Sequence, residues 1–149
     1  MDKITIRSLI ITPLKKIYHP KGDILHCMKD CDRGYSGFGE AYISKVKPDQ
    51  IKGWNRHKKM TLNFIVPIGS IKFVIIDDNI KSFRKDNIAE VELSPQNYQR
   101  LTVPPGLWVG FQNTSKTDSL LLNIADIKHV PTEKESMPLS KIDYNWSII

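Results

Sequence analysis

A short row of polar side chains near the start of the stretch 51–78 is the first place in this sequence where chemistry could occur. Asn55, His57 and Lys59 sit at every second position, so an extended strand would place them on one face, opposite Trp54 and Arg56. Buried polar groups without partners are costly, so such a face needs a wet or functional cavity to look into. His57 is the member that can exchange a proton near neutral pH. The structural alternative is a strand histidine that hydrogen-bonds a neighbour.

Three cationic side chains could meet a phosphorylated ligand. Lys59 could contact a phosphate, although exposed strand lysines are usually only solvated. Arg33, in the glycine-rich loop 30–39, could clasp a diphosphate with its two-pronged guanidinium, and Arg56 could do the same from the neighbouring position. The sequence leaves both interpretations open for each residue.

Other side chains have both a functional and a structural interpretation. Glu40 is polar in an apolar strand and is either a pocket acceptor or an exposed edge charge. Trp108 is either a stacking platform for a base or part of the core. His26 with Cys27 and Cys31 lacks a fourth ligand, so a zinc site is not expected there.

The elements that must position these residues are strands. No stretch sustains a 3.6-residue apolar period, whereas many short β-branched runs are separated by Gly/Pro turns, which indicates a sandwich or barrel. From residue 130 the chain is polar and is expected to be an ordered tail over the surface. The predicted strands lie at 3–11, 40–46, 51–59, 60–66, 71–76, 88–93, 100–103, 107–112 and 119–124.

Length and composition limit the class of protein. The 149 residues are expected to form a single domain, 1–149, and the 40% hydrophobic and 26% charged residues are ordinary for a soluble globular chain. The net charge of +6 permits an anionic partner, but no recognition helix or RNA-binding motif is present, so no nucleic-acid partner is expected. No apolar run of membrane length and no signal segment occur, so no membrane partner and a cytoplasmic location are the expectation.

Two islands of the sequence resemble the sugar-nucleotide branch of the cupins. The stretch 51–78 is similar to the strand pair of dTDP-4-dehydrorhamnose 3,5-epimerase-like proteins, and 100–113 (RLTVPPGLWVGFQN) is similar to their Pro-Pro-Gly turn and Gly-Phe strand. The ending at 142–146 (IDYNW) fits short members of the group. KGWNRHKK also resembles a segment of the 3,4-ketoisomerases, which are cupins too. The resemblance implies an all-β, cupin-type jelly-roll β-barrel with short turns.

At the site, this sequence differs from the epimerases that it resembles. The general base of the epimerases falls at Asn55, which has no group that titrates near neutral pH, and their enolate-steadying lysine falls near Leu62. Asn55 could instead bind a sugar hydroxyl or keto oxygen, or pair locally. His57 matches the second ketoisomerase histidine. If the chain enolises a keto-sugar, His57 must be the base, with His129 or Tyr144 as the acid, and no acidic residue that would orient His57 can be placed.

A metal is not expected. Metal-binding cupins supply His-x-His from one strand and a further His after the Pro-x-Gly turn, whereas this chain has Asn55-x-His57 and Val109. One imidazole cannot hold a divalent ion by itself, because such sites need three or more ligands.

The function implied by the resemblance is that of a sugar-nucleotide epimerase or isomerase. The expected partner is a nucleotide sugar, a dTDP-linked 4-keto-6-deoxyhexose, and the chemistry is proton abstraction alpha to the ketone, which needs no cofactor. A homodimer is also implied. Two alternatives stay open: a catalytically impaired cupin that binds or scaffolds a nucleotide sugar, and a 3,4-ketoisomerase that uses His57.

Overall fold

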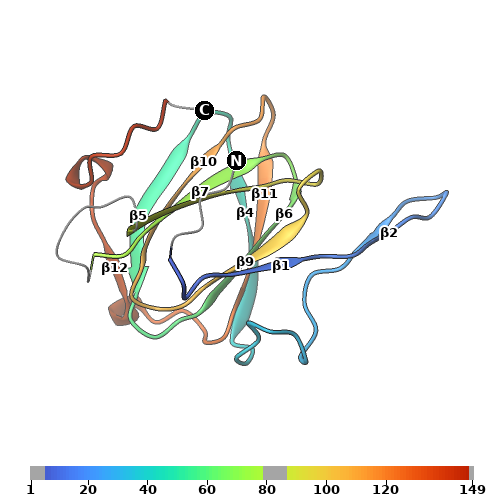
Figure 1. Cartoon of the computed structure of the whole chain (residues 1–149), viewed down its shortest axis with the longest axis horizontal. Coiled ribbons are helices and arrows are strands. Elements are labelled where there is room, and N and C mark those ends of the chain that lie inside the picture. The colour runs from blue at the N-terminus through green and yellow to red at the C-terminus, as the bar shows by residue number, and fades with distance from the viewer. Residues whose placement is uncertain (1–5, 79–86, 148–149) are drawn as a thin grey trace.

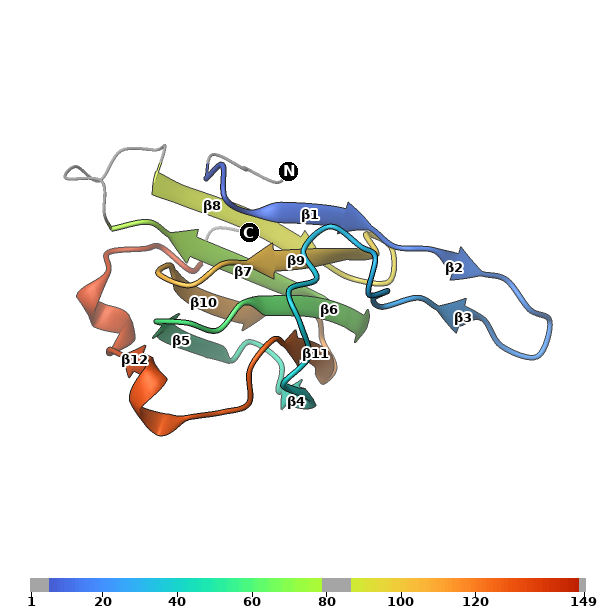
Figure 2. The same ribbon diagram turned by 90° about the horizontal axis from the view of Figure 1, so that it is seen from below.

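Two five-stranded antiparallel sheets pack face to face in the computed structural model, which describes residues 6–78 and 87–147 (Figures 1 and 2). The first sheet has the strand order β1-β9-β6-β11-β4 and the second has the order β12-β5-β10-β7-β8. The strands of the first sheet are β1 (Ile10–Pro13), β9 (Gln99–Val103), β6 (Leu62–Ile68), β11 (Ser119–Ala125) and β4 (Glu40–Val46). Those of the second are β12 (Lys134–Ser136), β5 (Ile51–His57), β10 (Trp108–Asn113), β7 (Ile71–Ile76) and β8 (Ile88–Leu93).

The prediction of an all-β fold is confirmed, and β4, β7 and β8 have the predicted bounds. The strand predicted at 3–11 is wrong over 6–9, where the chain turns and the Leu9 N–H donates to the Ile6 carbonyl at 3.2 Å. Residues 1–5 of that prediction lie outside the described residues. The strand predicted at 60–66 begins and ends two residues later.

The interior between the two sheets is mainly apolar. Phe64 of the first sheet stacks on Phe73 of the second, with ring centroids 5.0 Å apart, and Phe111 packs against both rings. Alternate residues of each strand point inward, as expected for a sandwich with one buried face per sheet. This core fixes the register of the strands that hold the polar row.

The C-terminal segment crosses the outer face of the second sheet. It contains the 3-10 helices η2 (Pro131–Glu133) and η3 (Leu139–Lys141) with β12 between them. Ile142 is buried against Trp54 in a second apolar cluster, and Tyr144 and Trp146 pack on the same indole. The segment expected as a polar tail is therefore part of the packing.

The strands β2 (Lys16–Ile17) and β3 (Ile24–Leu25) form an arm that extends away from the two sheets (Figures 1 and 2). The arm exposes Ile17, Tyr18 and Ile24. Within 6–78 and 87–147, no helix has the length and apolar character needed to cross a membrane.

Candidate active site

A cavity of about 590 Å³ lies between the two sheets at the end formed by β4, β5 and β12. Its base is apolar and is shared with the core, through side chains such as Phe64, Val109 and Leu121. Its walls are polar. Four residues singled out in the sequence line it: Glu40, Asn55, His57 and His129. The inward direction of Asn55 and His57 follows from strand alternation, because their chain neighbours Trp54 and Arg56 lie on the opposite face of the strand.

His57 is paired with a buried carboxylate. Its Nδ1 hydrogen-bonds Oε1 of Glu133, and both side chains are nearly inaccessible, at 10% and 6%. The other carboxylate oxygen of Glu133 accepts hydrogen bonds from the backbone N–H groups of Lys59, at 2.9 Å, and Met60, at 3.0 Å. Glu133 is therefore fixed by three donors.

These contacts decide the charge of Glu133 and the tautomer of His57. Burial acts to raise the pKa of Glu133, but the hydrogen bonds from His57, Lys59 and Met60 outweigh it and hold that pKa below its usual value. An ionised carboxylate only accepts hydrogen bonds, so Nδ1 of His57 must carry a proton. In the neutral ring Nε2 is then the lone-pair nitrogen, and it is the atom that can act as a base at the cavity.

Glu133 is the residue that sequence reasoning missed. It reaches His57 because β12 pairs with β5, with Lys134 opposite His57, and because the Lys58 N–H donates to the Glu133 carbonyl at 2.9 Å. Nothing local distinguishes Glu133 from Glu135, which points to the other side of β12 and pairs with Arg56. The sequence signal was only that two glutamates occur two positions apart in a segment expected to lie on the surface.

Asn55 is oriented by a neighbour on β12. Its side-chain oxygen accepts a hydrogen bond from the Ser136 hydroxyl at 2.6 Å. The amide nitrogen of Asn55 is therefore the group left to donate toward the cavity. That arrangement suits an oxygen ligand and not the acceptance of a proton from carbon.

Several polar side chains of the cavity were not singled out in the sequence. Tyr42 and Ser44 lie beside Glu40 on the inner face of β4, and Asn123 lies on β11. Two lysines, Lys52 of β5 and Lys134 of β12, also line the cavity. Period-2 alternation in 40–46 predicts Tyr42 and Ser44 on one face with Glu40, but nothing in the sequence placed that face opposite His57.

Arg56 and Trp108 lie on the outer side of the second sheet. The Arg56 guanidinium forms ion pairs with Asp78, at 3.0 Å, and Glu135, at 2.9 Å, and stacks 4.5 Å from the centroid of Trp108. The Trp108 indole N–H donates to the same Asp78 carboxylate at 2.9 Å. The structure therefore does not bring these two predicted binding residues into the cavity.

Tyr144 and Lys59 also lie outside the cavity. The Tyr144 hydroxyl donates to Glu90 at 3.0 Å, and burial, together with that carboxylate, raises the pKa of the phenol well above its usual range. The side chain is held edge-on to Trp54, on the far face of the sheet from His57. Lys59 follows the end of β5 and is exposed, and only its backbone N–H belongs to the site.

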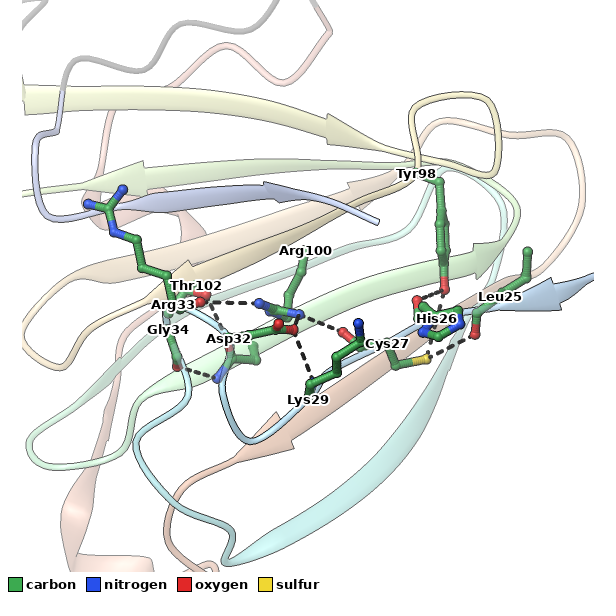
Figure 3. Close-up of polar contacts among 11 residues, drawn as sticks. Leu25, His26, Cys27, Lys29, Asp32, Arg33, Gly34, Tyr98, Arg100 and Thr102 are labelled. Atoms are coloured by element: carbon green, nitrogen blue, oxygen red, sulfur yellow. Dashed lines mark hydrogen bonds and ion pairs between the residues drawn. The ribbon is translucent and has the colours of Figure 1, made fainter. Parts of the chain in front are cut away.

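Arg33 lies on the opposite side of the first sheet, in the loop that covers β9. It is exposed, its side chain points away from the polar cluster around Arg100, and its carbonyl accepts a hydrogen bond from Arg100 Nη2 at 3.2 Å (Figure 3). A second cavity, of about 430 Å³, lies beside this cluster. Its carboxylate, Asp32, is engaged by Arg100 at 3.1 Å and by the Lys29 N–H at 3.0 Å. No imidazole there is paired with a carboxylate among the described residues, so the first cavity is the better candidate.

Within residues 6–78 and 87–147, no group of three or more His, Cys, Asp or Glu side chains is placed to hold a metal ion.

Comparisons with known proteins agree with the fold. No family model and no curated protein matches the chain. Among solved structures, it is similar to a dTDP sugar isomerase from Desulfovibrio desulfuricans G20, with 35% identity and a TM-score of 0.89 over 97% of this chain and 94% of that one. It is also similar to a dTDP-4-dehydrorhamnose 3,5-epimerase from Elizabethkingia anophelis NUHP1, with 18% identity and a TM-score of 0.79 over 99% and 85% of the two chains.

A third neighbour is QdtA, a sugar 3,4-ketoisomerase from Thermoanaerobacterium thermosaccharolyticum in complex with TDP, with 19% identity and a TM-score of 0.72 over 87% and 88% of the two chains. The two more distant neighbours show the fold, and the 35% identical one shows the family. The predicted cupin-type jelly roll is confirmed, and the kind of function supported is that of a sugar-nucleotide epimerase or isomerase. The chain belongs to the dTDP-4-dehydrorhamnose 3,5-epimerase-like, sugar-nucleotide epimerase and isomerase branch of the cupin superfamily.

Proposed function

We propose that this protein is an enzyme that abstracts a proton alpha to the ketone of a dTDP-linked 4-keto-6-deoxyhexose, with His57 as the base. The observation that carries the proposal is the pair of His57 and Glu133 in a cavity between the sheets. Glu133 holds the Nδ1 proton, so Nε2 is the nitrogen that takes the proton from carbon. The ketone accepts the electron pair as an enolate, and no cofactor is needed for that step.

The charges of the cavity favour an anionic ligand. Two cationic side chains, Lys52 and Lys134, line the cavity, whereas its lining has one acidic side chain among the described residues, Glu40. We assign the diphosphate to these two lysines, because the sequence candidates Lys59 and Arg33 lie outside the cavity. The amide nitrogen of Asn55 is the donor that we assign to a sugar oxygen.

A 3,4-ketoisomerase is the second candidate. It is favoured by the single imidazole–carboxylate pair found among the described residues, which suits proton transfer on one face of the sugar more than inversion at two carbons. The 35% identical relative is described as a dTDP sugar isomerase. A catalytically impaired nucleotide-sugar-binding cupin is the third outcome that the experiment must distinguish.

The experiment is solvent exchange. The protein is incubated with dTDP-4-keto-6-deoxyglucose in deuterated water, and deuterium at carbons 3 and 5 is followed by NMR. Deuterium at both carbons indicates an epimerase, and deuterium at carbon 3 with migration of the ketone indicates a ketoisomerase. Binding with no exchange contradicts the enzyme proposal.

His57→Gln is expected to lower the exchange rate about 10²- to 10⁴-fold, the usual contribution of a general base. His26→Gln is the matched control, because His26 lies beside the second cavity, and it should exchange at the wild-type rate. Exchange that survives His57→Gln would show that the base is another group.

We also propose that the protein forms a homodimer. The arm of β2 and β3 supports this, because it exposes Ile17, Tyr18 and Ile24 away from the two sheets, and an isolated two-stranded hairpin is only marginally stable. A cytoplasmic location stays a prediction of the sequence.

A further inference from the structure

Tyr42 stands on the opposite sheet of the cavity from His57. His57 belongs to β5 of the second sheet, and Tyr42 belongs to β4 of the first, yet both line the same cavity. The Tyr42 side chain is 45% exposed, so a ligand in the cavity can reach it. A phenol is both a donor and an acceptor, so its neighbours decide which role remains for a ligand.

A neighbouring side chain donates a hydrogen bond to the Tyr42 hydroxyl oxygen, and the Tyr42 O–H stays available to donate to a ligand. The side-chain nitrogen of Asn123 donates to the Tyr42 hydroxyl oxygen at 3.1 Å. The side-chain oxygen of Asn123 accepts from the backbone N–H of Asn63 at 3.1 Å, so the orientation of this amide is fixed by the chain itself. In the described part of the chain, the Tyr42 O–H has no acceptor.

The strand register holds this pair in place. Asn123 of β11 lies opposite Tyr42 of β4 on one side and opposite Phe64 of β6 on the other, and Asn123 is 1% exposed. Cross-strand neighbours on one face of an antiparallel pair have Cβ atoms about 4.5–5.5 Å apart. The Asn123 amide is therefore held in one orientation. It donates to the Tyr42 oxygen, so the Tyr42 O–H points away from Asn123.

We propose that Tyr42 donates a hydrogen bond from its O–H to the ketone oxygen of the bound sugar, and that Asn123 is the positioning residue that orients it. This inference rests on the proposed function and assigns to that reaction a group that the sequence did not indicate. As His57 Nε2 takes the proton from the alpha carbon, the C–H electron pair forms the carbon–carbon double bond. The C=O π pair moves to oxygen, and the Tyr42 O–H supplies the hydrogen bond that the developing enolate needs.

Of the two acids that the resemblance implied, His129 lines the cavity and Tyr144 does not, and Tyr42 is a further cavity group with the role of donor to the ketone oxygen. The Tyr144 hydroxyl donates to Glu90 on the far side of the second sheet, whereas the Tyr42 hydroxyl is in the cavity. The Asn55 amide provides a second donor from the same sheet as His57. Donors aimed at the place where negative charge develops stabilise the transition state more than the ground state.

Tyr42→Phe is the direct test, because it removes one oxygen atom and keeps the ring. Removing one such donor typically lowers kcat about 10²- to 10³-fold, so the exchange assay with dTDP-4-keto-6-deoxyglucose should show a fall of that size in kcat, with KM changed less than about threefold. Tyr35→Phe is the matched control, because Tyr35 lies outside the cavity lining, and it should behave as the wild type.

Asn123→Asp tests the positioning role without removing the acceptor that Asn63 needs. A carboxylate would accept the Tyr42 O–H proton and withdraw it from the ketone. We expect a loss in kcat as large as that of Tyr42→Phe, and no further loss when the two changes are combined, because both remove the same hydrogen bond. A merely structural role of Asn123 would give losses that multiply.

The outcomes separate this inference from the proposed function. A wild-type protein that exchanges, with Tyr42→Phe within about threefold of it, overturns the role of Tyr42 and leaves the proposed function standing. A fall confined to KM also overturns the donor role, since it would show ground-state binding only. A wild-type protein that binds the nucleotide sugar and never exchanges overturns both. If Tyr42→Phe fails to fold, Asn123→Asp decides, and wild-type kcat in that variant overturns the inference.

Discussion

The imidazole of His57 and the carboxylate of Glu133 lie 76 residues apart in the chain and form one unit in the fold. Each limits the other: the carboxylate fixes which ring nitrogen bears the proton, and the ring helps to keep the buried carboxylate ionised. Two backbone N–H groups complete the set of donors around Glu133. The ability of His57 Nε2 to act as a base depends on the tautomer of the imidazole, and Glu133 fixes that tautomer.

Glu133→Gln is expected to lower the exchange rate by about 10²- to 10⁴-fold at neutral pH, because a neutral amide no longer enforces the protonated Nδ1. The isosteric side chain keeps the volume of the site. Steady-state measurement of kcat with the keto-sugar nucleotide checks this. Glu135→Gln is the control, because that carboxylate pairs with Arg56 on the outer side of the sheet. Equal losses in the two variants would contradict an orienting role for Glu133.

The difference in stability between the wild type and this variant should depend on pH in a defined direction. The folded-state pKa of Glu133 is lowered, so its stabilisation is complete above the ordinary glutamate pKa of about 4.3 and is lost as the pH falls through the lower folded value. At pH 7 the variant should be less stable by about 1–3 kcal/mol. Urea unfolding should show this difference shrinking below about pH 4. A difference that stays constant down to pH 3 would mean that the carboxylate is not held ionised by its partners.

The loop between β3 and β4 has no regular structure, and one buried side chain of β9 makes several of the contacts that hold it. Arg100 of β9 is fully buried, and its guanidinium donates to the carbonyls of Cys27, at 2.7 Å, and Arg33, at 3.2 Å (Figure 3). It also pairs with Asp32. The pKa of that carboxyl is lowered by the Lys29 backbone N–H first and by Arg100 next, against the effect of burial. The glycine-rich loop, which the sequence suggested as a phosphate site, is instead the cover of the first sheet.

Arg100→Met should therefore destabilise the protein by at least about 2 kcal/mol, because two loop carbonyls lose their donor and Asp32 loses its charge partner. Amide hydrogen exchange in 27–34 should rise more than elsewhere, since this loop is what Arg100 holds. Chemical unfolding and exchange mass spectrometry measure the two effects.

Arg7→Met provides the comparison for Arg100, because Arg7 is exposed and its loss should change stability by no more than about 0.5 kcal/mol. If the two variants unfold alike, or if loop exchange is unchanged in Arg100→Met, the loop is held by something other than this guanidinium.

In the whole molecule, the arm of β2 and β3 is a part whose apolar side chains stay exposed in the single chain. Two copies that bury the exposed Ile17 and Ile24 would give the arm a partner. Light scattering should give twice the chain mass of 17.1 kDa. Replacing both isoleucines by Asp should shift the protein toward monomer, whereas Lys21→Ala at the turn of the arm should not. A wild-type monomer at all accessible concentrations would contradict the homodimer.

Local sequence pattern was enough to predict most of the strands and the inward face of β5. Strand bounds at 40–46, 71–76 and 88–93 follow from β-branched alternation between turns, and alternation also sends Asn55 and His57 to the side opposite Trp54. Family resemblance added the jelly roll. These features depend on residues close together in the chain, or on motifs that recur in relatives.

Which side chains meet in the site depends on how the strands pair and how the two sheets pack. Glu133 reaches His57 through the pairing of β12 with β5, and Tyr42 faces the same cavity because the two sheets close over each other. The same packing sends Tyr144 to the outer face of the second sheet. The physical reason is that alternation fixes the face of a strand on which a side chain lies. What that face meets depends on contacts between segments that are distant in the chain, and no local pattern encodes them.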